Sequence, residues 1–369
     1  MREIKYIIPM QQLKVLQMLL KNKLHARNIF LIIFVFNLIF YLFCLEYGLT
    51  VFDFSKNANT DGAAYYKIAL DPFSDPPVDS GFRYATFLYP VLTYFIAQGN
   101  ANLTAITMEL INIIFFAASV AIFYKIVKVE GYGISTIFYA FSPIMLISTH
   151  GAMNEPLFFF LIFTSYLLFR ENKLGKSSVF LSLACLTRPD FVVFTFPFFI
   201  KEKKANWMKY FMLPLATISI HGFYLVSRFG LEHFLRFTSG IDSGIAHSML
   251  GIPFYTFFQN RFFGGVDTPM ITGYNLIVNE VITWSVFIAV IMSIIVLTKK
   301  REDKFSLYLL IFSSIVQPAY SYFAGYFRIA ALAPSIYKLP CIIFKGKTLS
   351  IISLLYIIAS MTLLFGWFF

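Results

Sequence analysis

The sequence predicts an all-α, polytopic helical membrane protein with about 10–12 membrane segments. Of the 369 residues, 58% are hydrophobic and only 13% are charged, whereas soluble domains carry roughly 25% charged residues. The apolar residues lie in runs of about 20, which is the length that a helix needs to cross a bilayer. Because these runs do not alternate polar and apolar residues, the sequence does not favour a membrane β-barrel.

The N-terminal part of the chain sets the expected orientation. Residues 1–27 are basic and mildly amphipathic, which predicts a cytoplasmic segment lying at the membrane surface. Six basic residues precede the first apolar run at 28–46, so the positive-inside rule places the N-terminus in the cytoplasm. This run is too long for the core of a cleavable signal peptide. The polar stretch 47–83 is therefore expected to be a long first extracytoplasmic loop.

Further apolar segments follow this loop. Segment 177–200 is interrupted by Thr187-Arg188-Pro189-Asp190, which predicts a helical hairpin with Arg188-Pro189-Asp190 at its far turn. No soluble domain is visible between the segments. We expect the segments at 84–98, 103–124, 133–149, 156–169, 177–200, 210–227, 274–297, 305–323, 330–344 and 349–369.

Two points of the expected topology need separate mention. The number of crossings before residue 128 stays open: either 84–98 does not cross, or Lys125 and Lys128 lie outside the cytoplasm. A second polar insertion, 228–273, is expected to be extracytoplasmic. Because neither an internal repeat nor a change of composition divides the chain, 1–369 is predicted to be a single integral membrane domain.

The basic residues are distributed by topology rather than for nucleic acid. The net charge is +11, but the basic residues cluster in short segments between apolar runs, as in cytoplasmic loops. Of the eight expected outside the cytoplasm, six are arginines, whose fork of donors suits phosphate. The alternative is that these arginines meet lipid headgroups or carboxylates. The eight are Lys56, Lys67, Arg83, Arg188, Arg228, Arg236, Arg261 and Arg328.

The stretch 59–90 holds the first candidate for chemistry. The pattern after Thr60 predicts a helix that begins near Asp61 and carries Tyr65, Ile68 and Ala69 on one face. Asp61 then has two interpretations. It is either an N-terminal cap of this helix, or a general base at the membrane surface that deprotonates an acceptor hydroxyl.

Three further charged residues interrupt apolar sequence. Glu155 lies with His150 in a polar break between two apolar runs, where a carboxylate is costly unless it is paired or functional. Arg188 can pair with Asp190 at the turn of the predicted hairpin. Arg328 stands beside an apolar run and needs a partner, for which a phosphate or a carboxylate such as Glu155 or Asp190 is suitable.

Several common catalytic signatures are absent from the sequence. It contains no glycine-rich phosphate loop followed by Lys-Ser/Thr, no H-E-x-x-H motif and no G-x-S-x-G motif. The five histidines do not show the spacing of zinc ligands. A divalent cation held by the carboxylates is possible, but no clustered set of ligands requires one.

Short motifs follow one another along nearly the whole chain. They are Asp61-Gly62, Tyr66-Lys67-Ile68-Ala69, Arg83 to Leu88-Tyr89-Pro90, Ser142-Pro143, Asn154-Glu155-Pro156-Leu157, Leu186-Thr187-Arg188-Pro189 and Tyr326-Phe327-Arg328. Their order resembles that of the GT-C glycosyltransferases. Among these, it is most similar to the PIG-V-like mannosyltransferases, which are related to the enzyme that adds the second mannose of GPI anchors.

The resemblance implies a GT-C-like fold and a specific reaction. A polyprenyl-phosphate sugar, typically dolichyl-phosphate mannose, would be the donor, and a hydroxyl of an extracytoplasmic glycan or glycolipid would be the acceptor. Asp61 would be the catalytic base, and Arg188 and Arg328 would hold the donor phosphate, which leaves as an anion. The other residues that would shape the sugar and acceptor site are Tyr65, Tyr66, Arg83 and Glu155.

The same resemblance implies a multi-pass protein of the plasma membrane in a prokaryote or of the endoplasmic reticulum in a eukaryote, with an extracytoplasmic active site. A transporter or flippase of a lipid-linked sugar is the alternative, since it would share the aromatic spans and the arginines. Transporters usually have broken helices at matching positions of two halves, and the sequence shows one clear break. A membrane scaffold is the third interpretation, but it has no need for a long, charged first loop.

Overall fold

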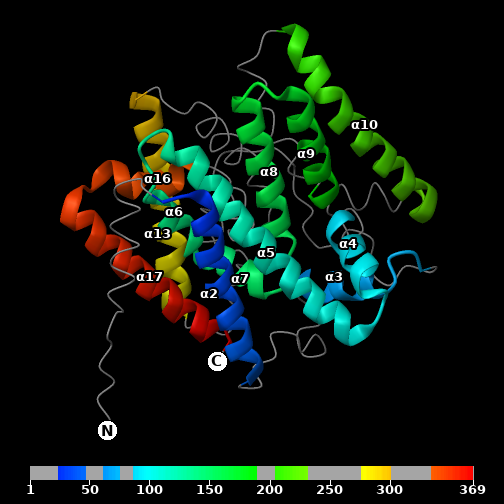
Figure 1. The fold of residues 1–369 in the computed structure, drawn as a ribbon, viewed down its shortest axis with the longest axis horizontal. Coiled ribbons are helices and arrows are strands. Elements are labelled where there is room, and N and C mark those ends of the chain that lie inside the picture. The colour runs from blue at the N-terminus through cyan, green and yellow to red at the C-terminus, as the bar shows by residue number, and fades with distance from the viewer. Residues whose placement is uncertain are drawn as a thin grey trace, which may run out of the picture.

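The structure is a computed structural model that describes residues 24–46, 61–74, 86–188, 204–231, 276–300 and 334–368. Every regular element within these ranges is an α-helix (Figure 1), which confirms the all-α prediction for this part of the chain. The helices are α2 (Ala26–Glu46), α3 (Asp61–Leu70), α4 (Leu88–Ala97), α5 (Ala101–Lys128), α6 (Ser135–Ala140), α7 (Pro143–His150), α8 (Glu155–Arg170), α9 (Leu174–Thr187), α10 (Lys204–Phe229), α13 (Leu276–Lys300), α16 (Pro334–Ile343) and α17 (Gly346–Phe368).

Three of the described helices are long and apolar enough to cross a membrane. These are α2, α5 and the part of α10 from Tyr210 to Phe229. Helices α7 and α8 meet at an angle of 120° across the short break 151–154, and they make a fourth candidate if the pair forms one broken span. Several helices of this length and apolar composition are typical of a helical integral membrane protein.

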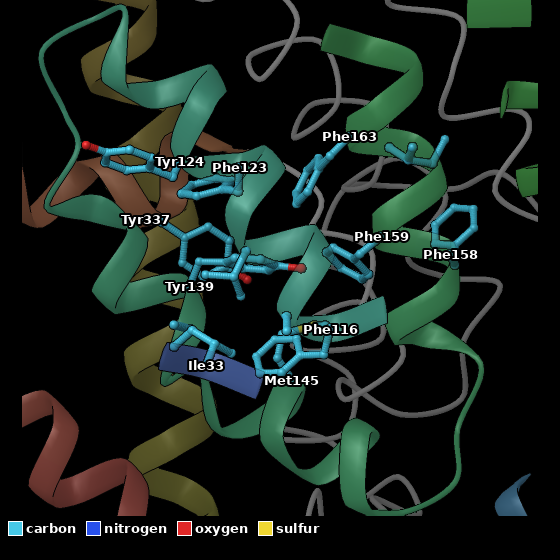
Figure 2. Close-up of a cluster of buried hydrophobic side chains, with 14 of the residues drawn as sticks. Ile33, Phe116, Phe123, Tyr124, Tyr139, Met145, Phe158, Phe159, Phe163 and Tyr337 are labelled. Atoms are coloured by element: carbon cyan, nitrogen blue, oxygen red, sulfur yellow. The ribbon is translucent and has the colours of Figure 1, made fainter. Parts of the chain in front are cut away.

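Helix α5 is the centre of the packing. It lies against α2, α4 and α8, while α8 packs on α9 and α9 packs on α10, so that these helices form a row (Figure 1). Tyr139 of α6 joins an aromatic cluster between α5 and its neighbours, and its ring centroid lies 4.9 Å from that of Phe123 and 5.1 Å from that of Tyr337 (Figure 2). Buried rings in tilted and edge-on pairs supply much of the apolar packing energy of such a core.

Polar contacts tie together one end of this bundle. The Lys128 Nζ at the end of α5 donates to the Leu24 carbonyl, just before α2, over 3.1 Å. Glu130, which follows α5, accepts hydrogen bonds from Arg170 at the end of α8 (3.0 Å) and from Lys338 of α16 (2.5 Å). We term this the basic end of the bundle. It brings Lys128, whose side of the membrane the sequence left open, to the same end as Arg170 and Lys338, which the sequence assigns to the cytoplasm.

The packing of α4 and α5 bears on whether segment 84–98 crosses the membrane, which the sequence left open. Helix α4 has 10 residues, which span about 15 Å, half of the apolar thickness of a bilayer. Helix α5 runs opposite to α2, because Lys128 at its end contacts Leu24 before the start of α2. The two basic residues of α5 therefore lie at the same end of the bundle as the start of α2. This arrangement favours the alternative in which 84–98 does not cross.

The predicted single segment 133–149 is wrong. It consists of two helices, α6 and α7, which are separated at Phe141 and Ser142. Pro143 is the physical reason, since proline has no backbone N–H to continue a preceding helix but fits the first turn of a new one.

The predicted interruption of 177–200 is confirmed at Arg188, one residue after the predicted start. Helix α9 ends at Thr187 and Arg188 occupies the C-cap position, whereas the rest of the predicted hairpin lies outside the described residues. The predicted start of the insertion 228–273 is too early, because helix α10 continues through Phe229. From residue 232 to 273 this insertion lies outside the described residues.

Candidate functional site

Helix α3 begins at Asp61, where the sequence predicts a helix start. The three residues that were expected on one face, Tyr65, Ile68 and Ala69, are all buried. The Tyr65 ring meets the Tyr89 ring of α4 edge-on at 5.9 Å between centroids. The hydroxyl of Tyr66 donates to the Ala101 carbonyl at the start of α5, over 3.3 Å. Both predicted site tyrosines therefore hold α3 against its neighbours.

The first turn of α3 lies against the break between α7 and α8. A Cβ atom added to Gly62 would stand 2.2 Å from the Gly151 carbonyl oxygen, far inside van der Waals contact. Glycine is thus required at position 62 by close approach of two backbones. Asp61 and Gly62, which are adjacent in the sequence, consequently start their helix at this break.

The break itself is built from residues 151–154. Ala152 has a φ of 53°, a left-handed conformation that costs roughly 1–2 kcal/mol for a residue with a Cβ. Pro156 stands in the first turn of α8, where its missing N–H costs nothing. Glu155 is the first residue of α8, and the positive end of the helix dipole favours a carboxylate at that position.

Glu155 forms a buried ion pair with Arg188. The Glu155 Oε1 and Arg188 Nη1 atoms are 2.6 Å apart, and the two side chains are 3% and 12% exposed. Beside this pair, the Asn154 Nδ2 donates to the Thr187 carbonyl over 3.0 Å. The start of α8 is therefore fastened to the end of α9 by two neighbouring interactions. The sequence offered Asp190 as the partner of Arg188 and Glu155 as a partner of Arg328, whereas in the structure Glu155 pairs with Arg188.

Three residues that the sequence singled out thus converge. The α3 start at Asp61, Glu155 at the start of α8 and Arg188 at the end of α9 surround the α7–α8 break. We term this region the site end of the bundle, opposite the basic end. The other two predicted site residues, Arg83 and Arg328, lie outside the described residues.

Another arginine fixes the far end of α3. Arg228, in the last turn of α10, donates to the carbonyl of Pro72 over 2.9 Å and also to the carbonyl of Ser74. It donates in addition to the Tyr224 hydroxyl over 2.6 Å. Because Pro72 and Ser74 follow α3, this arginine joins the first polar loop to α10. Its described contacts are with the protein itself.

The described residues contain no group of three or more His, Cys, Asp or Glu side chains placed to hold a metal ion. Of the two acidic residues at the site end, Asp61 and Glu155, the second is engaged by an arginine, and a carboxylate bound to a guanidinium is a poor ligand for a divalent cation. The sequence left a divalent cation here as one option without requiring it.

A second buried polar cluster lies beside the site end, and the sequence reasoning missed its central residue. Glu109 of α5 pairs with His150, the last residue of α7, over 2.5 Å, and both side chains are 0% exposed. One turn further along α5, the Asn112 amide donates to the α7–α8 break. The signal was present, because Glu109 is a lone acid inside the predicted segment 103–124, where an ionisable residue calls for a partner.

Replacing Gly62 with Ala tests the contact between α3 and the break. The added Cβ meets a backbone oxygen rather than a flexible side chain, so we expect destabilisation of about 1–3 kcal/mol. Thermal unfolding in detergent measures it. Gly175→Ala in α9 is the matched control, since its Cβ meets no atom within 4 Å. Equal stability of the Gly62→Ala variant and the unmodified protein would contradict the contact.

Comparison of the chain with models of protein families, with curated proteins and with solved structures gives no match.

Proposed function

We propose that this chain is a GT-C-type, multi-pass membrane glycosyltransferase. It moves a sugar, in the first place mannose, from a polyprenyl phosphate to a hydroxyl of an extracytoplasmic glycan or glycolipid. The supporting observation is the convergence of Asp61, Glu155 and Arg188 at the α7–α8 break. These residues come from three parts of the chain, and each belongs to a motif of the GT-C resemblance.

The chemistry assigned to these residues is a single displacement. Asp61 accepts the proton of the acceptor hydroxyl, whose oxygen then attacks C1 of the sugar. The bond between C1 and the phosphate oxygen breaks, and polyprenyl phosphate leaves with the bonding electron pair. Arg188, aided by Arg328, stabilises the negative charge that grows on this phosphate.

The Glu155–Arg188 pair suits that role. A guanidinium held by a carboxylate keeps its positive charge and a fixed direction in an apolar environment, which favours an interaction that strengthens as charge develops. Tyr65 and Tyr66 support the reaction by fixing α3. In this proposal Arg83 completes the sugar and acceptor site.

The orientation of the bundle agrees with an extracytoplasmic reaction. The basic end holds Leu24, Lys128 and Arg170, and the positive-inside rule assigns such a cluster to the cytoplasm. Helix α2 starts at this end and is long enough to cross a bilayer. The chain then reaches Asp61 through the first polar loop, so the site end faces the opposite side in the proposed topology.

The test is consumption of the donor. Detergent-solubilised protein is given polyprenyl-phosphate mannose or a nucleotide-linked mannose together with membrane glycolipid acceptors. We expect release of polyprenyl phosphate and labelling of the acceptor from the lipid-linked donor only. Transfer from the nucleotide sugar, or no transfer from either donor, would contradict the proposal.

One observation favours a second candidate function, a transporter or flippase of a lipid-linked sugar. The 120° bend between α7 and α8 is a broken helix of the kind that builds transport sites in membrane proteins. Reconstitution in vesicles with polyprenyl-phosphate mannose separates the two functions. Movement of the intact lipid-linked sugar across the bilayer, without cleavage of the phosphate bond, is the result that supports transport.

A further inference from the structure

The polar cluster of Glu109, His150 and Asn37 lies where apolar helices α2, α5 and α7 meet. His150 Nδ1 stands 2.5 Å from Glu109 Oε1, and His150 Nε2 stands 3.1 Å from Asn37 Oδ1. All three side chains are fully buried, and the Phe40 ring covers the imidazole at 4.8 Å between centroids. An acid and a histidine at such depth are costly, so the cluster needs an explanation beyond packing.

The hydrogen bonds fix how many protons the cluster holds. The Asn37 Nδ2 donates to the Ile33 carbonyl over 2.8 Å, so the Asn37 oxygen faces His150 and its Nε2 carries a proton. One further proton lies between His150 Nδ1 and Glu109. Whether the His150 nitrogen or the Glu109 oxygen carries this proton, the net charge of the two side chains together is zero. The cluster therefore links α2, α5 and α7 by hydrogen bonds without a net charge. An uncharged hydrogen-bond donor at position 109 can make the same link.

A second residue of α5, Asn112, contacts the α7–α8 break that follows His150. Three residues after Glu109, the Asn112 Nδ2 lies 3.4 Å, 3.2 Å and 2.9 Å from the carbonyl oxygens of Ser148, Thr149 and Met153. The first two of these belong to the last turn of α7, where helix carbonyls lack partners along the helix. Helix α5 is thus hydrogen-bonded both to the end of α7 and to the turn that leads to α8.

The site end depends on this turn. Glu155 follows Met153 by two residues and meets Arg188 directly after the break. The Gly151 carbonyl lies within the break, and Gly62 in the first turn of α3 packs directly against it. A shift of the break therefore moves the ion pair and the start of α3 together.

We propose that Glu109 and Asn112 are positioning residues for the candidate site. They hold the α7–α8 break in one geometry, Glu109 through His150 and Asn112 through three carbonyls, so that Glu155, Arg188 and the start of α3 stay aligned. The assignment deepens the proposed glycosyl transfer and rests on it. In this role Glu109 neither contacts substrate nor carries a proton to it.

A pair of variants at position 109 separates positioning from proton transfer. In Glu109→Gln the amide donates to His150 Nδ1 while Nε2–H remains on Asn37, so the neutral link survives and most of the activity is expected to remain. In Glu109→Leu the link is lost, and kcat is expected to fall about a hundredfold with little change in KM for the donor. Equal loss of activity in both variants would overturn the proposal, because only proton transfer needs an acid.

Amide hydrogen exchange of peptides covering 148–155 supplies a readout that does not require turnover. Exchange is expected to rise in Glu109→Leu and to stay unchanged in Glu109→Gln. If Glu109→Leu does not accumulate, Asn112→Leu removes the other restraint on the break, the hydrogen bonds to its carbonyls, and is expected to raise exchange likewise. Unchanged exchange in the Leu variants overturns the positioning role even where sugar transfer is present. Absence of sugar transfer in the unmodified protein overturns the proposed function and leaves this readout intact.

Ser119→Ala is the matched control on the same helix. Ser119 is fully buried in α5, and its Oγ lies 2.8 Å from the Tyr139 hydroxyl, in the aromatic cluster away from the break. We expect this loss of a buried polar contact to change neither kcat nor exchange at 148–155. If Ser119→Ala reproduces the Glu109→Leu result, the effect is general loosening of the bundle, and the positioning assignment is wrong.

Discussion

The Asp61→Asn variant is expected to lose sugar transfer by about 10²–10⁴-fold, the usual contribution of a general base. Asparagine has the size of aspartate but cannot accept the proton of the acceptor hydroxyl. Folding is expected to remain intact, because removing one negative charge from the first turn of α3 costs only about 0.3–1 kcal/mol. Turnover with polyprenyl-phosphate mannose and size-exclusion behaviour in detergent are the two measurements.

Asp71→Asn is the control for this variant. Asp71 follows the other end of α3, and its Oδ1 accepts a hydrogen bond from the Phe73 amide over 3.3 Å, which an asparagine oxygen can also accept. The same chemical change there is expected to leave transfer unaltered. Retained turnover by Asp61→Asn would remove Asp61 as the base and return it to the simpler role of helix initiation.

The sequence predicts the local features of the site because they depend on near neighbours. The polar residues before an apolar face mark the start of α3, and the burial of Tyr65, Ile68 and Ala69 confirms that face. The end of α9 at Thr187 follows from the proline after Arg188, which disfavours helical geometry for the residue before it.

The pairing of charges was beyond sequence reasoning. Arg188 has Asp190 two residues away, and only the packing of α8 on α9 brings Glu155, 33 positions earlier, within 2.6 Å. Glu109 is a similar case, since its partner His150 lies 41 positions later. Periodicity locates helices and their faces, but it does not state which helices meet.

The lengths of several helices could not be predicted from the hydropathy pattern. Segments 84–98 and 133–149 are apolar enough to suggest two crossings, yet the structure gives short helices, α4, α6 and α7. Apolar residues serve equally well inside a protein core and inside a bilayer, so hydropathy alone does not distinguish a short buried helix from a span. The break between α7 and α8, which carries the candidate site, arises from such short helices.

Glu155 and Arg188 provide the second prediction with a large effect. In Glu155→Gln or Arg188→Gln, one buried charge loses its partner, which is expected to cost about 3–5 kcal/mol of stability. The double variant removes both charges and lets the two amides hydrogen-bond, so most of this stability is expected to return. Thermal unfolding in detergent of the four proteins, including the unmodified one, gives the coupling between the two residues.

Activity should not follow stability in this set. The double variant lacks the Arg188 cation and leaves only Arg328 to stabilise the leaving phosphate, so its kcat is expected to stay about 10²–10³-fold below that of the unmodified protein. Arg170→Gln is the matched control, because Arg170 pairs with Glu130 at the basic end with about a third of its side chain exposed (31%). That variant is expected to lose less than about 1 kcal/mol and no activity. Recovery of both stability and transfer in the double variant would show that Arg188 only fastens α9 to α8, and Arg328 would then be the remaining proposed cation for the donor phosphate.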